Sequence, residues 1–343
     1  MSAAILPTHT PALFQEAVGR AAEVLRAGGV AAIPTETVYG LAADAFSAPA
    51  VEAIYAAKGR PSHNPVIVHV ASAALARECC SDWPEVADRL AARFWPGPLT
   101  LVLPRSARIP DVVAAGGPTV GIRWPAHPFM QAVIRECGFP LAAPSANPSD
   151  RLSPTCAEHV AEGLGDRIPL IVDGGQCAVG IESTVVDVTG PVPRILRPGV
   201  ITAAQVAEAV GLPTDAAGTA PAAVSAATEG PLRSPGQLTR HYSPKARLRV
   251  VAWSDDADLA RQIAADRSAG GRIHILAHTR LPSAERFPNV SFIPDDPEAF
   301  ARAIYGYLHA CDARGADLIL VEALPSDDRW DGVRDRLRRA SAA

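Results

Sequence analysis

Residues 211–232 divide the 343-residue chain into two parts. This stretch consists mostly of Ala, Pro, Thr, Gly and Ser and shows no helical or strand periodicity, which is typical of a linker. A chain of this length commonly holds two domains, at roughly 100–200 residues each. We therefore predict one domain over residues 1–210, a linker over 211–246 in which order returns by Ser234, and a second domain over 247–343.

Behind the linker, strand and helix patterns alternate along the chain. Strands are expected at Leu248–Ala252, Ile273–Leu276, Val290–Ile293 and Leu318–Val321, and helices at Asp256–Arg267, Pro297–Cys311 and Arg329–Ala340. Alternation at this spacing predicts a mostly parallel sheet with helices on its faces, so we expect a small Rossmann-like α/β domain. No G-x-G-x-x-G motif follows any of these strands, and we therefore expect no dinucleotide site there.

The first part of the chain also mixes helices and strands, in a less regular order. Thr10 followed by Pro11 predicts the start of a helix, and Gly28 ends the apolar pattern that follows. Further helices are expected at residues 49–58, 71–79, 84–94, 128–137 and 202–210, and strands at residues 30–33, 66–70, 99–103, 120–124, 170–172, 184–188 and 194–196.

Charge and composition exclude several classes of protein. The formal net charge of −4 argues against a generally basic nucleic-acid surface. Only two of the 32 basic residues are lysines, Lys58 and Lys245, and neither lies in a Walker A loop. Six scattered cysteines without C-x-x-C spacing favour a reducing cytosol over a disulfide scaffold or a zinc site. We expect a cytoplasmic protein with no signal peptide and no membrane span.

Two clusters of polar residues follow predicted elements near the start of the chain. The segment Pro34–Leu41 places threonines, Glu36 and Tyr39 at a strand end, where open α/β sheets present ligand contacts, although a capped turn explains the same residues. Lys58 and Arg60 stand at a helix end on a proline-stiffened loop. Cations there complement the helix dipole, but a compact ammonium beside a planar guanidinium also suits a polyphosphate.

Three further clusters have the same character. Arg123 ends a predicted strand among apolar residues, where it needs either a carboxylate-bearing substrate or an internal Asp or Glu. The segment Ala142–Ser149 combines small residues with hydroxyls and an amide, as a ligand loop or a proline-rich turn does. Gly180–Thr184 and Leu196–Gly199 add a hydroxyl and another strand-end arginine. One anion site assembled from many loops explains all five clusters.

Together these motifs resemble the two-domain threonylcarbamoyl-AMP synthases, whose catalytic domain is YrdC-like. The resemblance covers about residues 12–199 and rests on PTETVYGL at 34–41, KGRP at 58–61, GIR at 121–123 with Pro125, SAN at 145–147, ST at 183–184 and RPG at 197–199. HYSP at 241–244 resembles the segment that closes over the nucleotide in the two-domain members. The resemblance implies a twisted, open mixed sheet with helices for the first domain.

The resemblance also implies a nucleotidyltransferase that forms threonylcarbamoyl-AMP and pyrophosphate from L-threonine, bicarbonate and ATP. Threonine and bicarbonate give N-carboxythreonine, whose carboxylate attacks the α-phosphorus of ATP. Mg²⁺ accompanies the ATP, with no protein ligand named. A downstream tRNA threonylcarbamoyltransferase then modifies adenosine in tRNAs that read ANN codons, and weak binding of tRNA by this chain is left open.

The matching positions take the roles that the family gives them. Lys58 and Arg60 are the expected catalytic residues, because they hold the phosphates and stabilise the departing pyrophosphate, and Arg197 assists. Threonine binding is expected from Thr37, His69, Arg123, Ala143 and Ser183. Nucleotide binding is expected from Lys58, Arg60, Asn64, Thr119, Ser145, Asn147, Ser153, Arg197 and Tyr242.

Other functions share parts of this pattern. An RNA-binding module is disfavoured by the negative net charge and the lack of aromatics interleaved with basic residues. A carbamoyltransferase of the hydrogenase-maturation type also contains a YrdC-like domain, but it needs zinc-finger-like and further domains that this chain lacks. A third alternative is that the C-terminal domain binds an unrelated regulator, and its sequence does not decide this.

Overall fold

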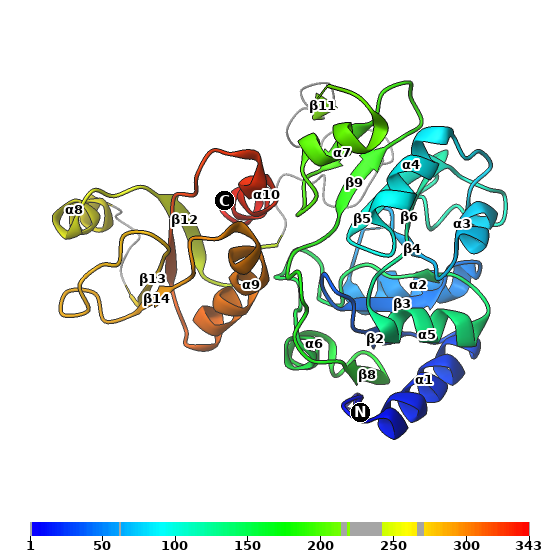
Figure 1. Cartoon of the computed structure of the whole chain (residues 1–343). Coiled ribbons are helices and arrows are strands. Elements are labelled where there is room, and N and C mark those ends of the chain that lie inside the picture. The colour runs from blue at the N-terminus through cyan, green and yellow to red at the C-terminus, as the bar shows by residue number, and fades with distance from the viewer. Residues whose placement is uncertain (1, 62, 214–217, 220–241, 266–270, 343) are drawn as a thin grey trace.

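The computed structural model describes residues 2–61, 63–213, 218–219, 242–265 and 271–342, which form two α/β domains around two separate sheets (Figure 1). The predicted return of order at Ser234, most of the predicted linker and His241 of the HYSP motif lie outside the described residues.

The larger sheet has eleven strands in the order β1-β8-β2-β3-β7-β4-β6-β5-β9-β10-β11. They are β1 (Ala4–Pro7), β2 (Ala31–Ile33), β3 (Gly40–Asp44), β4 (Val68–His69), β5 (Leu99–Pro104), β6 (Thr119–Arg123), β7 (Leu141–Ala142), β8 (Leu170–Asp173), β9 (Thr184–Asp187), β10 (Arg194–Arg197) and β11 (Gly218–Thr219). Parallel pairs such as β4–β6 occur beside antiparallel pairs such as β5–β6, so the predicted mixed sheet is confirmed.

Seven helices accompany this sheet in the described part of the first domain. They are α1 (Pro11–Arg26), α2 (Ala48–Lys58), α3 (Ala73–Cys79), α4 (Glu85–Phe94), α5 (Pro128–Cys137), α6 (Ala157–Leu164) and α7 (Ala203–Val210). The hydroxyls of Thr10 and Thr202 cap α1 and α7 as the sequence predicts. Helices α1 and α5 pack together, with the rings of Phe14 and Phe129 edge to face at 5.2 Å.

The smaller sheet has four strands in the order β12-β15-β13-β14, and every neighbouring pair is parallel. They are β12 (Arg247–Val251), β13 (Ile273–Ala277), β14 (Val290–Phe292) and β15 (Leu318–Glu322), with helices α8 (Asp256–Ala265), α9 (Pro297–Ala313) and α10 (Asp331–Ala340). The predicted parallel α/β domain is therefore confirmed. No helix in the described residues has the length and apolar character that crossing a membrane requires.

The two domains share a continuous apolar interface. Val38, Leu152 and Ile181 of the first domain belong to the same buried cluster as Tyr305 of α9 and Leu337 of α10. Helices α9 and α10 turn toward the first domain, which lies to the right in Figure 1. Burial of apolar surface on both sides stabilises the docked arrangement.

Two glycines permit the backbones of the domains to touch. A Cβ at Gly332 of α10 would lie 2.7 Å from the carbonyl oxygen of Gly199, and one at Gly180 would lie 2.4 Å from Cα of Arg302. Gly180 also has a positive φ of 86°, which favours glycine on conformational grounds. The close approach brings α10 against the segment that carries Arg197.

A pair of histidines bridges the domains. His159 of α6 and His309 of α9 stack with ring centroids 3.7 Å apart, and Nε2 of His309 lies 3.1 Å from the carbonyl oxygen of Ser153. Nδ1 of His159 accepts the N–H of Thr155 at 3.3 Å, so this nitrogen is unprotonated. Burial, together with the neighbouring His309, lowers the pKa of His159 to about 4. The charged groups around the pair are Glu158, Glu162, Asp312 and Lys245.

Acidification is therefore expected to destabilise the docked domains. In the unfolded chain His159 titrates near 6.5 and in the fold near 4, so the folded state binds fewer protons in that window. The contribution of the neutral His159 ring to the free energy of unfolding is fully present above pH 6.5 and is lost as the pH falls toward 4. We expect a loss of about 1 kcal/mol, a small value because the ring is only partly buried. Thermal unfolding at pH 7 and pH 5 checks this. The melting midpoint of wild type should drop further than that of a His159→Gln/His309→Gln variant, and equal drops would contradict it.

Candidate functional site

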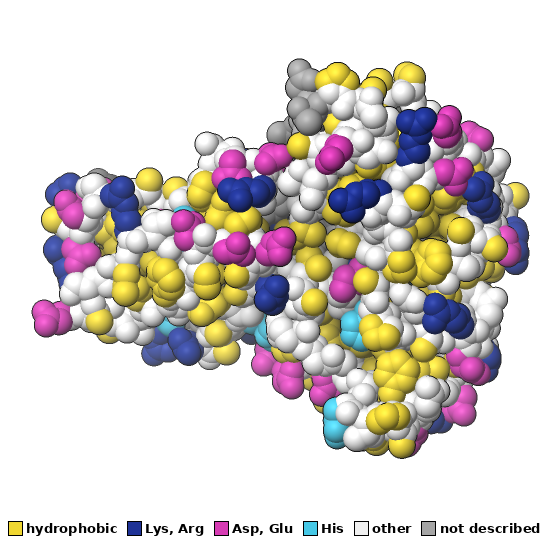
Figure 2. Space-filling view, in the orientation of Figure 1, with side chains coloured by type: hydrophobic (Ala, Val, Ile, Leu, Met, Phe, Trp, Pro, Cys, Tyr) yellow, Lys and Arg dark blue, Asp and Glu magenta, His cyan; other side chains and the backbone are white. Residues whose placement is uncertain are grey.

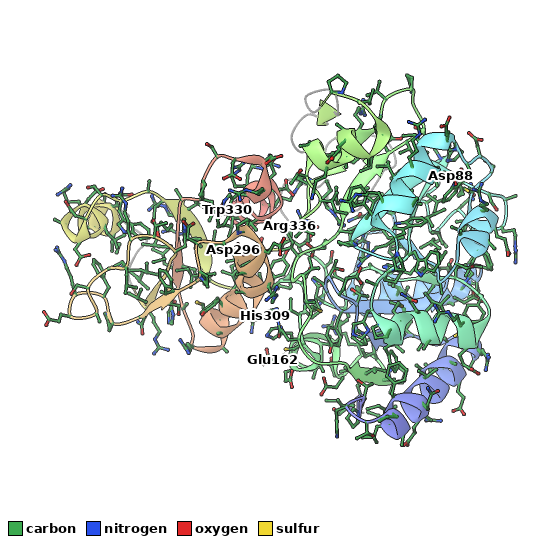
Figure 3. All side chains as sticks on the ribbon, in the orientation of Figure 1. Asp88, Glu162, Asp296, His309, Trp330 and Arg336 are labelled. Atoms are coloured by element: carbon green, nitrogen blue, oxygen red, sulfur yellow. The ribbon has the colours of Figure 1, made fainter. Side chains whose placement is uncertain are left out.

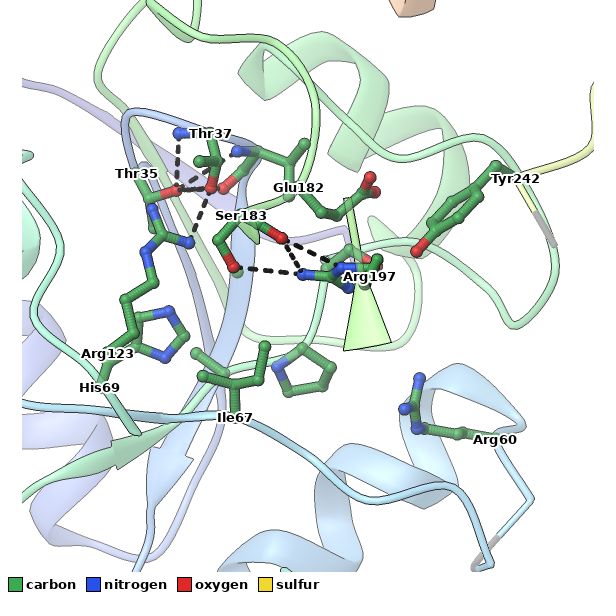
Figure 4. Close-up of a pocket in the computed structure, with 15 residues that line it drawn as sticks. Thr35, Thr37, Arg60, Ile67, His69, Arg123, Glu182, Ser183, Arg197 and Tyr242 are labelled. Carbon is green, nitrogen blue, oxygen red and sulfur yellow. Dashed lines mark hydrogen bonds between the residues drawn. The ribbon is translucent and has the colours of Figure 1, made fainter. Parts of the chain in front are cut away.

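The strand ends of the larger sheet converge on one pocket that is partly open to solvent (Figure 4). Polar side chains at the carboxyl ends of β2, β4, β6 and β10 reach it, as is typical of ligand sites in open α/β sheets. The lining residues are Thr35, Thr37, Val38, Gly40, Arg60, Ile67, His69, Arg123, Ala143, Pro144, Ser145, Glu182, Ser183, Arg197 and Tyr242.

Arg123 occupies one end of the pocket. Its Nη2 lies 2.7 Å from Oε1 of Glu36, and its Nη1 donates to the hydroxyl of Thr37 at 2.8 Å. Burial alone would raise the pKa of Glu36, but the Arg123 guanidinium outweighs burial and holds that pKa below its usual value. The sequence left open an internal acid or a substrate carboxylate, and the structure identifies the internal acid as Glu36. Since a guanidinium has five N–H donors, this pairing leaves donors for a substrate carboxylate.

His69 lies beside Arg123 because β4 pairs with β6 in parallel and brings the two residues into register. Burial, together with the positive charge of Arg123, lowers the pKa of His69 to about 3. The imidazole is therefore neutral at physiological pH. Its Nδ1 is buried without a hydrogen-bond partner among the described residues, so it has a polar atom available for a ligand.

Ser183 and Arg197 form the middle of the pocket wall. Arg197 donates to the carbonyl oxygen of Ser183 from both Nε and Nη2, at 3.1 and 2.9 Å, and Nη2 also reaches the Ser183 hydroxyl at 3.1 Å. That hydroxyl lies 2.8 Å from the hydroxyl of Thr100 on β5. The pairing of β9 with β10 places the two strand segments side by side and thereby fixes this arginine.

Arg60 lies across the pocket from Arg123 (Figure 4). Its Nε and Nη2 donate to the carbonyl oxygens of Asn64 and Pro65, at 3.1 and 2.8 Å, which holds the guanidinium on the loop after α2. Gly59 ends that helix in the left-handed conformation, with φ of 62°. The pocket thus has arginines at both ends, with Arg197 between them.

Lys58 is predicted as a phosphate ligand, but in this structure it lies behind the pocket wall. Its side chain is 2% exposed, and its Nζ donates to the carbonyl oxygens of Ser145 and Asn147 at 2.6 and 2.5 Å. Burial and then the charge of Arg60 hold the pKa of Lys58 well below its usual value. The amine therefore fastens the SAN turn whose Ser145 lines the pocket.

The structure gathers most of the predicted site residues. Thr37, Arg60, His69, Arg123, Ala143, Ser145, Ser183, Arg197 and Tyr242 line the pocket, whereas Lys58, Asn64, Thr119, Asn147 and Ser153 do not. Thr119 begins β6 at the strand end away from Arg123. Asn64 and Asn147 are buried, and the side-chain oxygen of each has no partner among the described residues.

Tyr242 belongs to the HYSP motif, for which the family resemblance implies a position over the nucleotide. It is 2% exposed, lines the pocket and has a positive φ of 61°. The next residue, Ser243, donates its N–H to the carbonyl oxygen of Asp150 at 3.0 Å and bridges to Arg151. The start of the C-terminal part therefore docks onto the loop that follows the SAN turn.

Six lining residues were not among the predicted site residues. They are Thr35, Val38, Gly40, Ile67, Pro144 and Glu182. Five of them stand inside or beside quoted motifs, so motif membership was a usable signal. Ile67 precedes His69 by two positions on an extended segment, and the period of two places both side chains on one face. Glu182 directly precedes the ST motif, but no local pattern indicates its partner, because that contact comes from Arg336 of the second domain.

The residues at the pocket do not form a metal site of their own. No group of three or more His, Cys, Asp or Glu side chains gathers at one point within the described residues. The two carboxylates nearest the pocket, Glu36 and Glu182, each pair with an arginine. This donor set does not match the oxygen-rich cage that a protein-held divalent cation requires.

Comparison with known proteins covers both halves of the chain. Residues 23–199 match the family described as "Telomere recombination", and residues 201–342 match the family described as "Threonylcarbamoyl-AMP synthase, C-terminal domain". The threonylcarbamoyl-AMP synthase of Pyrococcus abyssi is 39% identical over 324 residues, covering 94% of this chain and 93% of the relative. That of Bacillus subtilis is 39% identical over 340 residues, covering 98% and 94%.

A solved structure resembles the whole chain as well. The crystal structure of Pyrococcus abyssi Sua5 complexed with L-threonine has a TM-score of 0.89 and 36% sequence identity, and the match covers 99% of this chain and 98% of that one. The structural similarity therefore includes both domains and their relative arrangement.

Proposed function

The chain belongs to the threonylcarbamoyl-AMP synthase family, and from that premise we propose that its pocket joins L-threonine, bicarbonate and ATP into threonylcarbamoyl-AMP and pyrophosphate. The observation that carries the proposal is a single pocket with arginines at both ends. Arg123 lies among neutral donors at one end, and Arg60 and Arg197 lie toward the other.

At the Arg123 end we place threonine. The guanidinium binds the amino-acid carboxylate, and Glu36 fixes the plane of the guanidinium from behind. The neutral His69 and the hydroxyls of Thr37 and Ser183 offer hydrogen bonds to the rest of the molecule without adding charge. A pocket of this kind distinguishes threonine from serine by one methyl group, a difference of about 1–3 kcal/mol.

At the other end we place the nucleotide. The carboxylate of N-carboxythreonine attacks the α-phosphorus, the bond from that phosphorus to the bridging oxygen breaks, and pyrophosphate leaves. Arg60 and Arg197 stabilise the charge that moves onto the departing group, and Tyr242 covers the nucleotide. Because the reaction needs no covalent enzyme intermediate, positioning and charge neutralisation are the contributions required of the protein.

An omission experiment tests this function. Labelled ATP is incubated with the purified chain, and pyrophosphate release is followed with threonine, bicarbonate or both withheld. We expect release only when both are present, together with a labelled adenylate that contains the bicarbonate carbon. A protein that only binds RNA or nucleotide gives no release under any of these conditions, and that result would refute the proposal.

The remaining roles complete the proposal. Mg²⁺ would accompany the ATP phosphates, offset part of their charge and keep much of its water. A tRNA threonylcarbamoyltransferase consumes the product. Mixed charges on the face in Figure 2, with acidic and basic side chains interspersed, do not favour a basic tRNA-binding surface there. All six cysteines are free thiols, which supports a cytoplasmic location.

We also keep the proposed division of the chain. The domains at residues 1–210 and 247–343 correspond to the two sheets, except that β11, inside the proposed 211–246 linker, pairs with β10 of the first sheet.

A further inference from the structure

A carboxylate stands on the wall of a pocket proposed to hold a polyphosphate. Glu182 lines the pocket together with Arg60 and Arg197. A bare negative charge at that place would repel the phosphates, and its burial makes the repulsion stronger than in water. The charge therefore requires compensation, and the structure supplies it from the second domain.

Arg336 of α10 reaches across the domain interface to this carboxylate. Its Nε donates to Oε2 of Glu182 at 2.6 Å, while the hydroxyls of Tyr305 and Ser153 donate to the same carboxyl group. Arg336 is 1% exposed and lies at the boundary of the two domains in Figure 3. Burial alone would raise the pKa of Glu182, but Arg336 and Arg197 outweigh burial and lower it.

The same guanidinium also holds the backbone on both sides of the pocket wall. Nη2 donates to the carbonyl oxygen of Glu182 at 3.1 Å, and Nη1 donates to that of Pro198 at 2.9 Å. These two carbonyls flank the segments that carry Ser183 and Arg197. The guanidinium carbon also lies 5.3 Å from the centroid of the Tyr242 ring, within the range of a cation–π contact.

Neighbours on α10 orient Arg336. Oδ2 of Asp335 lies 3.0 Å from its Nη1, and Asp335 is itself paired with Arg338 and Arg339. These pairs leave little freedom for the guanidinium to turn away from Glu182. Charge, backbone contacts and aromatic contact therefore all come from the side chain of Arg336, and the Tyr305 hydroxyl adds one further hydrogen bond from the second domain to Glu182.

We propose that Arg336 is a positioning residue for the nucleotide end of the pocket, where it neutralises Glu182 and holds the backbone at residues 182 and 198 and the Tyr242 ring in place. The inference rests on the proposed function, because it assumes that phosphates occupy this end. The main anchor of the threonine end lies apart from Arg336, since within the described residues Arg123 bonds to Glu36, Thr37 and Gly97 of the first domain. Arg336 reaches the threonine end through the backbone carbonyl beside Ser183, so its loss should weaken ATP binding far more than threonine binding.

The test is the kinetics of Arg336→Gln with both substrates. We expect the KM for ATP to rise at least tenfold, with the Kd for threonine, measured by calorimetry without ATP, changed less than threefold. Arg336→Lys keeps the charge and should give a smaller rise. Arg334→Gln is the matched control, because Arg334 lies on the same helix and, in the described part of the chain, bonds to Asp331 and Pro325 of its own domain.

Removing the carboxylate charge should rescue the defect. In Arg336→Gln, the buried Glu182 loses its paired guanidinium and keeps only the influence of Arg197, so its pKa rises and ATP binding should improve as the pH falls. Glu182→Gln/Arg336→Gln should recover most of the ATP affinity and lose this pH dependence. The other groups facing Glu182 are Arg197, Tyr242, Tyr305 and Ser153, and none of them changes in these variants.

The outcomes separate the two proposals. If wild type releases no pyrophosphate, the proposed function fails before Arg336 is tested. If wild type is active and Arg336→Gln raises both substrate constants alike, or the double variant restores nothing, Arg336 has only a structural role and the inference is wrong. If Arg336→Gln does not fold, the comparison of Arg336→Lys with the double variant decides in the same way.

Discussion

Arg60→Ala is expected to lower the rate of pyrophosphate release by about 100- to 1000-fold, the usual cost of removing one preorganised group that stabilises developing charge. The guanidinium is held in place by the carbonyls of Asn64 and Pro65, so its position is set before the nucleotide binds. Because its position is fixed in advance, the guanidinium can stabilise the negative charge that develops on the departing pyrophosphate. Because the residue lies away from Arg123, threonine affinity should change little.

The assay is steady-state pyrophosphate release at saturating threonine and bicarbonate. Arg20→Ala serves as the control, since Arg20 is exposed on α1 and pairs with the exposed Glu23. Arg60→Lys should recover part of the loss, because it keeps the charge but not the planar fork. A turnover number for Arg60→Ala within threefold of wild type would show that the phosphates do not lie at this end of the pocket.

Lys58→Ala is expected to reduce activity by about 100-fold through a different route, since misplacement of pocket groups by about 1 Å is sufficient for such a loss. The change removes the ammonium donor from the carbonyl oxygens of Ser145 and Asn147, and Ser145 still accepts the N–H of Asn147 at 3.1 Å. The buried Asn147 carbonyl that loses its donor costs about 1–3 kcal/mol, so the SAN turn should shift and the melting temperature should fall.

The chain offers a matched control, Lys245→Ala. The side chain of Lys245 is exposed, and its backbone N–H, which the substitution keeps, bonds to Asp312. Activity and melting temperature of that variant should match wild type. If Lys58→Ala keeps full stability and loses activity, the amine instead contacts the phosphates directly in the complex. Full activity of Lys58→Ala would contradict both roles.

Much of the fold follows from local sequence signals. The β-branched run at 184–188 and the capped pattern after Thr202 predict β9 and α7 closely. The strands β3 and β7 carry no such signal, because their sequences GLAAD and LA contain neither β-branched nor aromatic residues. These two strands are defined by their pairing with neighbouring strands. Helix α6 also lacks a local signal, because no side chain caps its first turn.

The candidate site also contains residues that the sequence could predict and contacts that it could not. Residues at strand ends, such as Arg123 and Arg197, could be predicted because a charge among apolar residues is visible in the sequence. The partner of Arg123 could not, since Glu36 is far away in the chain and only the register of the sheet brings it near. The contact of Glu182 with Arg336 spans 154 positions and two domains, so no local pattern indicates it.

A crystal structure of this chain with L-threonine and a non-hydrolysable ATP analogue tests the central claim most directly. The account predicts the threonine carboxylate on Arg123, beside His69 and Thr37, and the phosphates between Arg60 and Arg197 under Tyr242. A nucleotide bound outside this pocket, or threonine at the Arg60 end, would contradict it.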